Sequence, residues 1–221
     1  AASTMGGTFS GTATTGNITD TGALAITGTT TLVTSADDAT ITLNTATNAF
    51  AGAMTITTND SSGNDADVTI DGGTTVLSIN TSTIDGDLIL TTGNATGIAD
   101  TGTVTIGGNL SATTDANDGD IILNQLAVDG TVSLTTNGTG AVTIVNDAGL
   151  SFATSTVGGT IGATATTGDI TDAGILTITG DAIFITSATG SNIILDTSSN
   201  AFSNSVEIRA DDGTEAFGNI T

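Results

Sequence analysis

The stretch ATTGNITDTGALAITG at residues 13–28 returns as ATTGDITDAGILTITG at residues 165–180. The match runs from residues 1–69 to residues 153–221 without insertion or deletion, at an offset of 152 residues, and nearly half of the aligned pairs are identical. A gapless repeat of this length is typical of stacked architectures, in which each unit is one spatial period. We therefore interpret residues 1–221 as one continuous segment of an array that holds about one and a half units.

The composition predicts strands rather than helices. The chain has 51 Thr and 30 Gly but no Pro, Cys, His, Trp or Tyr. Thr, Val and Ile favour pleated strands, whereas Gly, Asn and Asp favour the turns between strands. No window of the sequence sustains the period of 3.6 that an amphipathic helix requires. The expected fold class is therefore all-β.

The expected strands are short and closely spaced, which favours a parallel β-solenoid. Each apolar triplet has room for one or two inward side chains, so each coil of the chain depends on its neighbours to complete a core. A coil of about 19–25 residues would place six to eight coils in the unit, with a length of roughly 29–38 Å, and about nine to twelve coils in the chain. Tandem β-sandwiches remain the alternative. The triplets lie at residues 24–26, 41–43, 54–56, 68–70, 88–90, 104–106, 121–123, 132–134, 142–144, 175–178 and 193–195.

Comparison of the two copies indicates which side chains face inward. Apolar positions that both copies retain alternate with positions that vary, as expected for strands with one buried face. Two varying positions carry Glu207 and Arg209, which predicts an exposed ion pair worth about 0–1 kcal/mol. Around residues 31–34 the face stays unassigned, because Leu32 and Val33 are both apolar in both copies. The retained pairs are Leu24 and Leu176, Ile26 and Ile178, Ile41 and Ile193, Leu43 and Leu195, Met54 and Val206, and Ile56 and Ile208.

The charge of the chain bears on its partners and location. With 23 acidic residues and one basic residue, the formal net charge is −22, which excludes nucleic acid and anionic membranes as electrostatic partners. No apolar run is long enough for a transmembrane helix, so membrane insertion is not expected. Arg209 offers the single site for a trypsin-like protease, which suits an extracellular fibre and equally a surface protein of a halophile.

Three phrases of the sequence resemble the repeats of filamentous-haemagglutinin-like giant bacterial exoproteins. These phrases are ITDTGALAITGTTTL at 18–32, ATITLNTATNAFAGAMTI at 39–56 and TVTIGGNLSATT at 103–114, and the resemblance covers most of 13–60, 98–114 and 165–208. It implies a right-handed parallel β-helix that is secreted to the cell surface as an adhesin or filament.

Three acidic stretches are candidate calcium sites, because oxygen ligands at alternate positions beside a glycine turn can hold Ca²⁺. No stretch fits the EF-hand loop or the calcium-binding nonapeptide, and ordinary exposed turns use the same residues. The sequence therefore predicts no metal or cofactor site and leaves calcium open as an alternative. The candidate residues are Asp60, Asp65, Asp67, Asp85, Asp87, Asp115, Asn117, Asp118 and Asp120.

The residue types argue against an enzyme. Without His or Cys, the chain has neither a Ser/His nor a Cys/His nucleophile, and without Lys, Tyr or Trp it lacks the usual contacts for sugars. Carboxylate pairs, as in polysaccharide-processing β-helices, and Thr-x-Thr pairs, as in ice-binding solenoids, remain alternatives. The Thr pairs are Thr40/Thr42, Thr55/Thr57, Thr103/Thr105 and Thr177/Thr179.

We therefore expect no catalytic residue and a structural role, as a repeat segment of an extracellular filament, stalk or large surface adhesin that gives length, stiffness and protease resistance. The expected partners are further copies of the repeat along the axis, in the same chain or stacked head to tail, because open strand edges pair with whatever follows. A ligand-binding or calcium-binding adhesin module is the alternative function.

Overall fold

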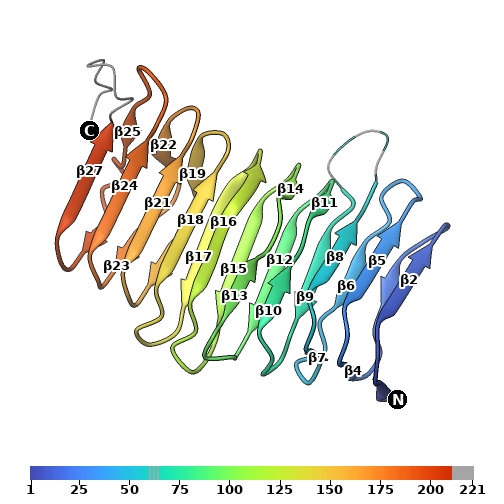
Figure 1. Ribbon diagram of the computed structural model, residues 1–221. Coiled ribbons are helices and arrows are strands. Elements are labelled where there is room, and N and C mark those ends of the chain that lie inside the picture. The colour runs from blue at the N-terminus through green and yellow to red at the C-terminus, as the bar shows by residue number, and fades with distance from the viewer. Residues whose placement is uncertain (60, 62, 64, 211–221) are drawn as a thin grey trace.

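The chain folds into a single stack of short parallel strands. The computed structural model describes residues 1–59, 61, 63 and 65–210. In this part of the chain there are 27 β-strands and no helix. Strands from successive coils lie side by side, with β2 near one end of the stack and β27 at the other (Figure 1). The predicted all-β parallel solenoid is confirmed.

The strands form three sheets, which we name A, B and C. Sheet A contains β1 (Ser3–Met5), β4 (Leu24–Ile26) and β7 (Ala49–Phe50). Sheet B contains β2 (Phe9–Ala13), β5 (Thr30–Thr34), β8 (Met54–Thr57), β10 (Leu77–Ile79), β11 (Ser82–Ile84), β13 (Ile98–Asp100), β14 (Val104–Ile106), β16 (Ile121–Val128), β18 (Val142–Asn146), β21 (Ile161–Ala165), β24 (Ala182–Thr186) and β27 (Val206–Ala210). Sheet C contains β3 (Ile18–Thr19), β6 (Ile41–Leu43), β9 (Val68–Asp71), β12 (Leu88–Thr92), β15 (Leu110–Thr114), β17 (Thr131–Thr136), β19 (Leu150–Phe152), β20 (Ser155–Val157), β22 (Ile170–Asp172), β23 (Leu176–Ile178), β25 (Ile193–Ile194) and β26 (Ala201–Phe202).

The strand register gives the length of each coil. In sheet B, nine successive parallel pairings lead from β2 to β27, which corresponds to about 9 turns. The shortest coil, from Val142 to Ile161, has 19 residues. The longest, from Ile41 to Val68, has 27 residues and so exceeds the expected range, because β9 begins only at Val68, well after β8 ends at Thr57.

The core is a ladder of Ile, Leu, Val and Ala along the axis of the stack. The inward faces that the repeat predicts are buried at Ile26, Ile41 and Met54. In β5, the position that the sequence left open, Leu32 is buried and Val33 faces outward, because stacking on β8 places Leu32 beside the buried Ile56.

Val206 is an exception to the predicted inward face, since its side chain is 41% exposed. Its equivalent in the first copy, Met54, is fully buried and pairs with Ile79 in the following coil. Val206 pairs only with Ala182 of the preceding coil within the described chain. The predicted face is therefore correct for Met54, whereas burial of Val206 would need another coil on the same side.

The cross-section of the stack changes along its length. In the first coils, β2 and β5 each form one straight side in sheet B, and the other side bends into two strands, β3 and β4. At β8 the straight side divides, because β8 pairs with both β10 and β11. At β17 the opposite side divides in the same way, into β19 and β20. The bend thus moves to the opposite side of the stack and then returns, which explains the uneven spacing of the apolar triplets.

Candidate functional site

The candidate calcium ligands near residue 67 belong to a ladder of side chains that join successive coils. Asp67 Oδ1 accepts the backbone N–H of Asp87 at 2.8 Å, and Asp87 Oδ1 accepts that of Asn109 at 2.6 Å. Asn109 Oδ1 in turn accepts the N–H of Thr131 at 2.8 Å. Each acceptor directly precedes a strand of sheet C, where it pairs a donor at the corner of the next coil. These side chains therefore link each coil to the next.

The other acidic residues near Asp67 and Asp87 do not take part in this ladder. Asp60 lies outside the described residues. Asp65 is exposed and contributes its backbone oxygen to Asp67 N–H at 2.9 Å. The backbone N–H of Asp85 donates to Thr58 Oγ1 at 2.9 Å, whereas Asp85 Oδ2 is a buried atom with no hydrogen-bond partner.

The stretch at residues 115–120 also binds the neighbouring coils. Asp118 Oδ1 accepts Thr139 N–H at 2.8 Å, Asp120 Oδ1 accepts Ala141 N–H at 2.7 Å, and Asn117 Nδ2 donates to Gly93 O at 2.7 Å. Asn117 and Asp118 adopt φ of 58° and 55°, a left-handed conformation that Asn and Asp tolerate better than most residues. The turn geometry thus accounts for these residue types.

Within the described ranges, no group of three or more His, Cys, Asp or Glu side chains gathers as metal ligands would. The acidic stretches are instead spread over several coils, and the carboxylates of Asp67, Asp118 and Asp120 accept backbone N–H groups of the neighbouring coil.

A polar clamp that the sequence analysis missed occupies the bend of the first coils. Asn48 is buried, its Oδ1 accepts the N–H of Leu24 at 2.8 Å, and its Nδ2 donates to Asp20 Oδ2 at 2.7 Å. The second copy repeats the clamp with Asp172 and Asn200. Identity of both residues between the copies was the available signal, but it gave no hint that residues 28 positions apart touch.

Asp100 fills the same role where the bend lies on sheet B. Its side chain is buried, and its two carboxylate oxygens accept the backbone N–H groups of Asn124 at 3.1 Å and Gln125 at 2.8 Å. These two residues lie in the register shift of β16, between Leu123 and Leu126, where the regular ladder is interrupted. The carboxylate therefore replaces ladder hydrogen bonds that the shift removes.

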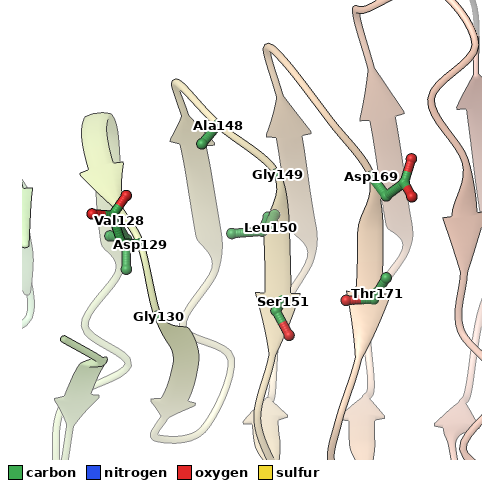
Figure 2. A pocket seen from close by; sticks show the side chains of 9 residues that line it. All are labelled: Val128, Asp129, Gly130, Ala148, Gly149, Leu150, Ser151, Asp169 and Thr171. Carbon is green, nitrogen blue, oxygen red and sulfur yellow. The ribbon is translucent and has the colours of Figure 1, made fainter. Parts of the chain in front are cut away.

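A pocket of about 300 Å³ lies at the corner where the chain enters β17, β19 and β22 (Figure 2). Figure 2 shows Asp129 and Asp169 on opposite sides of it, with Leu150 between them. Asp169 Oδ1 already accepts the N–H of Asn192 at 2.7 Å. None of the described lining residues is aromatic or cationic. The pocket lies at a corner between the sheets and offers little chemistry for a ligand.

The other surface features that the sequence suggested are an ion pair and several threonine pairs. Arg209 contacts Glu207 at 2.5 Å on the exposed face of β27, so the expected ion pair forms. Thr57 and Thr105 belong to one outward column, with Thr83 between them. Thr103 lies outside the strands, so the Thr103/Thr105 pair does not form two adjacent columns on sheet B. Thr177 belongs to a separate single column on sheet C, with Thr91, Thr113, Thr135 and Thr156.

We expect calcium to have no specific effect on stability, because the carboxylates of Asp67, Asp87, Asp118 and Asp120 already accept backbone hydrogen bonds. The melting temperature in a chelator should equal that in excess calcium at matched ionic strength. Matching is needed because any salt screens the repulsion of a chain with net charge −22. Circular dichroism at a fixed scan rate is the measurement, and a calcium-dependent rise beyond that with magnesium or sodium would contradict it.

In the part of the chain that the structure describes, no helix is long and apolar enough to cross a membrane. No curated protein and no solved structure matches the chain. Residues 1–57 and 139–209, more than half of the chain, match a family described as repeats of unknown function. The two matched segments contain the corresponding strands β2–β8 and β21–β27. On this match, the chain belongs to the family of repeats of unknown function DUF5649.

Proposed function

We propose that the chain is a structural repeat segment of an extracellular bacterial filament, stalk or large surface adhesin. One observation carries this proposal. After 152 residues the chain returns to the same sheet, since seven successive pairings in sheet B lead from β2 to its equivalent β21. A unit that ends in the orientation in which it began can be repeated to any length without a change of direction.

The coil-to-coil ladder supports a role as a stiff rod. Side chains such as Asp67, Asp87 and Asn109 pair backbone donors at the corners, where the sheets are interrupted. The parallel sheets pair the backbone elsewhere. A rod built in this way exposes few extended segments to a protease, and Arg209, its only basic residue, lies within β27.

The proposed location and partners rest on charge and on the sequence resemblance. The phrases shared with filamentous-haemagglutinin-like exoproteins favour secretion to the cell surface, and a net charge of −22 favours solubility there. We propose further copies of the repeat along the axis as the partners, without nucleic acid or membrane insertion. No catalytic role is proposed, because the chain has no His or Cys and a single cation.

The proposal predicts that length grows in proportion to the number of units. Insertion of one more 152-residue unit into the chain should lengthen the rod by seven rungs, about 34 Å at a rung spacing of about 4.8 Å. Electron microscopy of the purified chains with one and two added units measures this. Equal lengths, or beads in place of rods, would contradict a stiff axial repeat.

The location needs a separate test on the native protein. Antibodies raised against residues 1–210 should label intact bacterial cells or the medium without permeabilisation. Labelling only after permeabilisation would overturn the extracellular assignment and leave the rod itself untouched.

A further inference from the structure

Two strands of the chain dock on the preceding coil through the same serine contact. In β11, Ser82 Oγ accepts the backbone N–H of Ile56 at 3.0 Å and donates to Asn80 O at 2.7 Å. In β20, Ser155 Oγ accepts the N–H of Leu134 at 3.0 Å and makes the same contact two residues back, to Ala153 O. Both serines are buried, although one lies in sheet B and the other in sheet C.

The strands that receive these serines also share a sequence. Residues 56–58 read ITT and residues 134–136 read LTT. The middle threonine of each pairs with the threonine that follows the serine, Thr57 with Thr83 and Thr135 with Thr156. The last threonine accepts a backbone N–H through Oγ1, from residue 85 at 2.9 Å and from residue 158 at 3.0 Å. We call this arrangement the Ser-Thr joint: a strand that begins Ser-Thr and stacks on a segment of the preceding coil that reads Ile/Leu-Thr-Thr.

A third Ser-Thr strand has no partner of this kind in the described chain. Residues 3–5 (STM) form β1, which pairs with β4 on one side only. Ser3 is exposed, whereas its equivalents Ser82 and Ser155 are buried. Met5 and Phe9 are only partly buried, although the corresponding residues of the second copy are buried completely.

The glycines near the joint also indicate that β1 is shaped to receive a partner coil. A Cβ on Gly158 would lie 1.8 Å from the backbone oxygen of Gly138, so the joint on β17 requires glycine there. A Cβ on Gly6, the equivalent residue in the first coil, would meet nothing within 4 Å. Gly6 has no left-handed φ that would require glycine either. Within the described chain, therefore, no contact or φ requires glycine at position 6, whereas a docked coil like residues 131–152 would require it. The joint on β8, which has Asp85 at this position, does not.

We infer that the open edges of β1, β2 and β3, at the end of the stack, form a docking surface for the final coil of another repeat unit. A third Ser-Thr joint would connect the two. This inference rests on the proposed function as an axial repeat and adds the identity of the contact. The occupant is a coil like residues 131–152, which ends its sheet C strand in LTT and covers the second copy of the same surface, β20, β21 and β22. The described end of this chain does not qualify, because residues 208–210 read IRA and carry no threonine hydroxyl.

A chain extended at the amino terminus tests the inference. A copy of residues 70–152 joined before residue 1 of the full chain places LTT where the joint requires it. We expect the backbone amides of residues 3–26 to exchange with deuterium at least about tenfold more slowly than in the unextended chain. In both chains, the amides of β11 and β20 should be slow and so serve as internal references. Nuclear magnetic resonance resolves these amides individually.

Two variants separate the joint from simple continuation of the sheet. Gly6→Ala should leave the unextended chain unchanged and remove most of the added protection in the extended chain. Ser3→Ala should reduce protection in the extended chain, whereas Ser10→Ala, on the outward face of β2, should not.

Three results would overturn the inference. The first is fast exchange of residues 3–26 in the extended chain, and the second is an added segment that stays unfolded on this surface. The third is a Gly6→Ala variant that is protected as well as its parent. None of these would affect the test of rod length or of cell-surface labelling, so failure of the joint and failure of the proposed function remain distinguishable.

Discussion

Ile106→Asp is expected to lower the free energy of unfolding by about 3–5 kcal/mol, or to open the stack locally. Ile106 is fully buried in β14, between Ile84 of the preceding coil and Val128 of the following one. A carboxylate at this rung would be enclosed by apolar side chains on both sides along the axis. Since the chain has a single cation, Arg209, no opposite charge is at hand to compensate it.

The neighbouring Thr105→Asp is the matched control. Thr105 lies on the outward face of the same strand and is exposed. The same added charge should therefore change the free energy of unfolding by no more than about 0.5 kcal/mol. Urea unfolding followed by circular dichroism measures both variants, and hydrogen exchange detects a local opening. Similar losses in the two variants would mean that net charge, rather than burial, decides stability in this chain.

The difference between these two adjacent positions could be predicted from the sequence. In the triplet at residues 104–106 the apolar Val104 and Ile106 flank a threonine, and a half-buried strand repeats its environment every second residue. Within residues 1–69 and 153–221, alternation of retained and variable residues between the copies identifies inward faces on the same ground. The same reasoning left Leu32 and Val33 open, since both are apolar in both copies. Stacking on Ile56 decides between them, and that contact depends on register rather than on composition.

The polar architecture could not be predicted in the same way. The clamp between Asp20 and Asn48 and the contact from Asp100 to Gln125 join residues 28 and 25 positions apart. Coil lengths vary between 19 and 27 residues, so the spacing in sequence does not say which residues stack. For the same reason, the Asp-rich turns read equally well as calcium ligands. An oxygen that accepts a backbone N–H of the next coil and one that binds a cation use the same residue types.

Asn146→Leu is expected to destabilise the fold by about 2–4 kcal/mol, because it leaves buried backbone groups without partners. Asn146 is 1% exposed, in the strand that follows the register shift of β16. Its Oδ1 accepts Val128 N–H at 2.8 Å, and its Nδ2 donates to Val128 O at 3.0 Å and to Gly149 O at 2.7 Å. Leucine has the same number of side-chain heavy atoms, also branched at Cγ, and leaves no cavity, so the loss reports mainly the missing hydrogen bonds.

Two further variants test whether the loss comes from the buried hydrogen bonds. Asn146→Asp keeps the acceptor for Val128 N–H but loses both donors and buries a charge, so it should be at least as harmful as leucine. Asn137→Leu places the same side chain at an exposed turn and should change the free energy of unfolding by no more than about 0.5 kcal/mol. Chemical unfolding of the three variants gives the comparison. If Asn146→Leu were as stable as the parent chain, the amide would be dispensable where the ladder of sheet B is interrupted. The polar side chains at the shifts and corners would then fill space rather than hold the coils together.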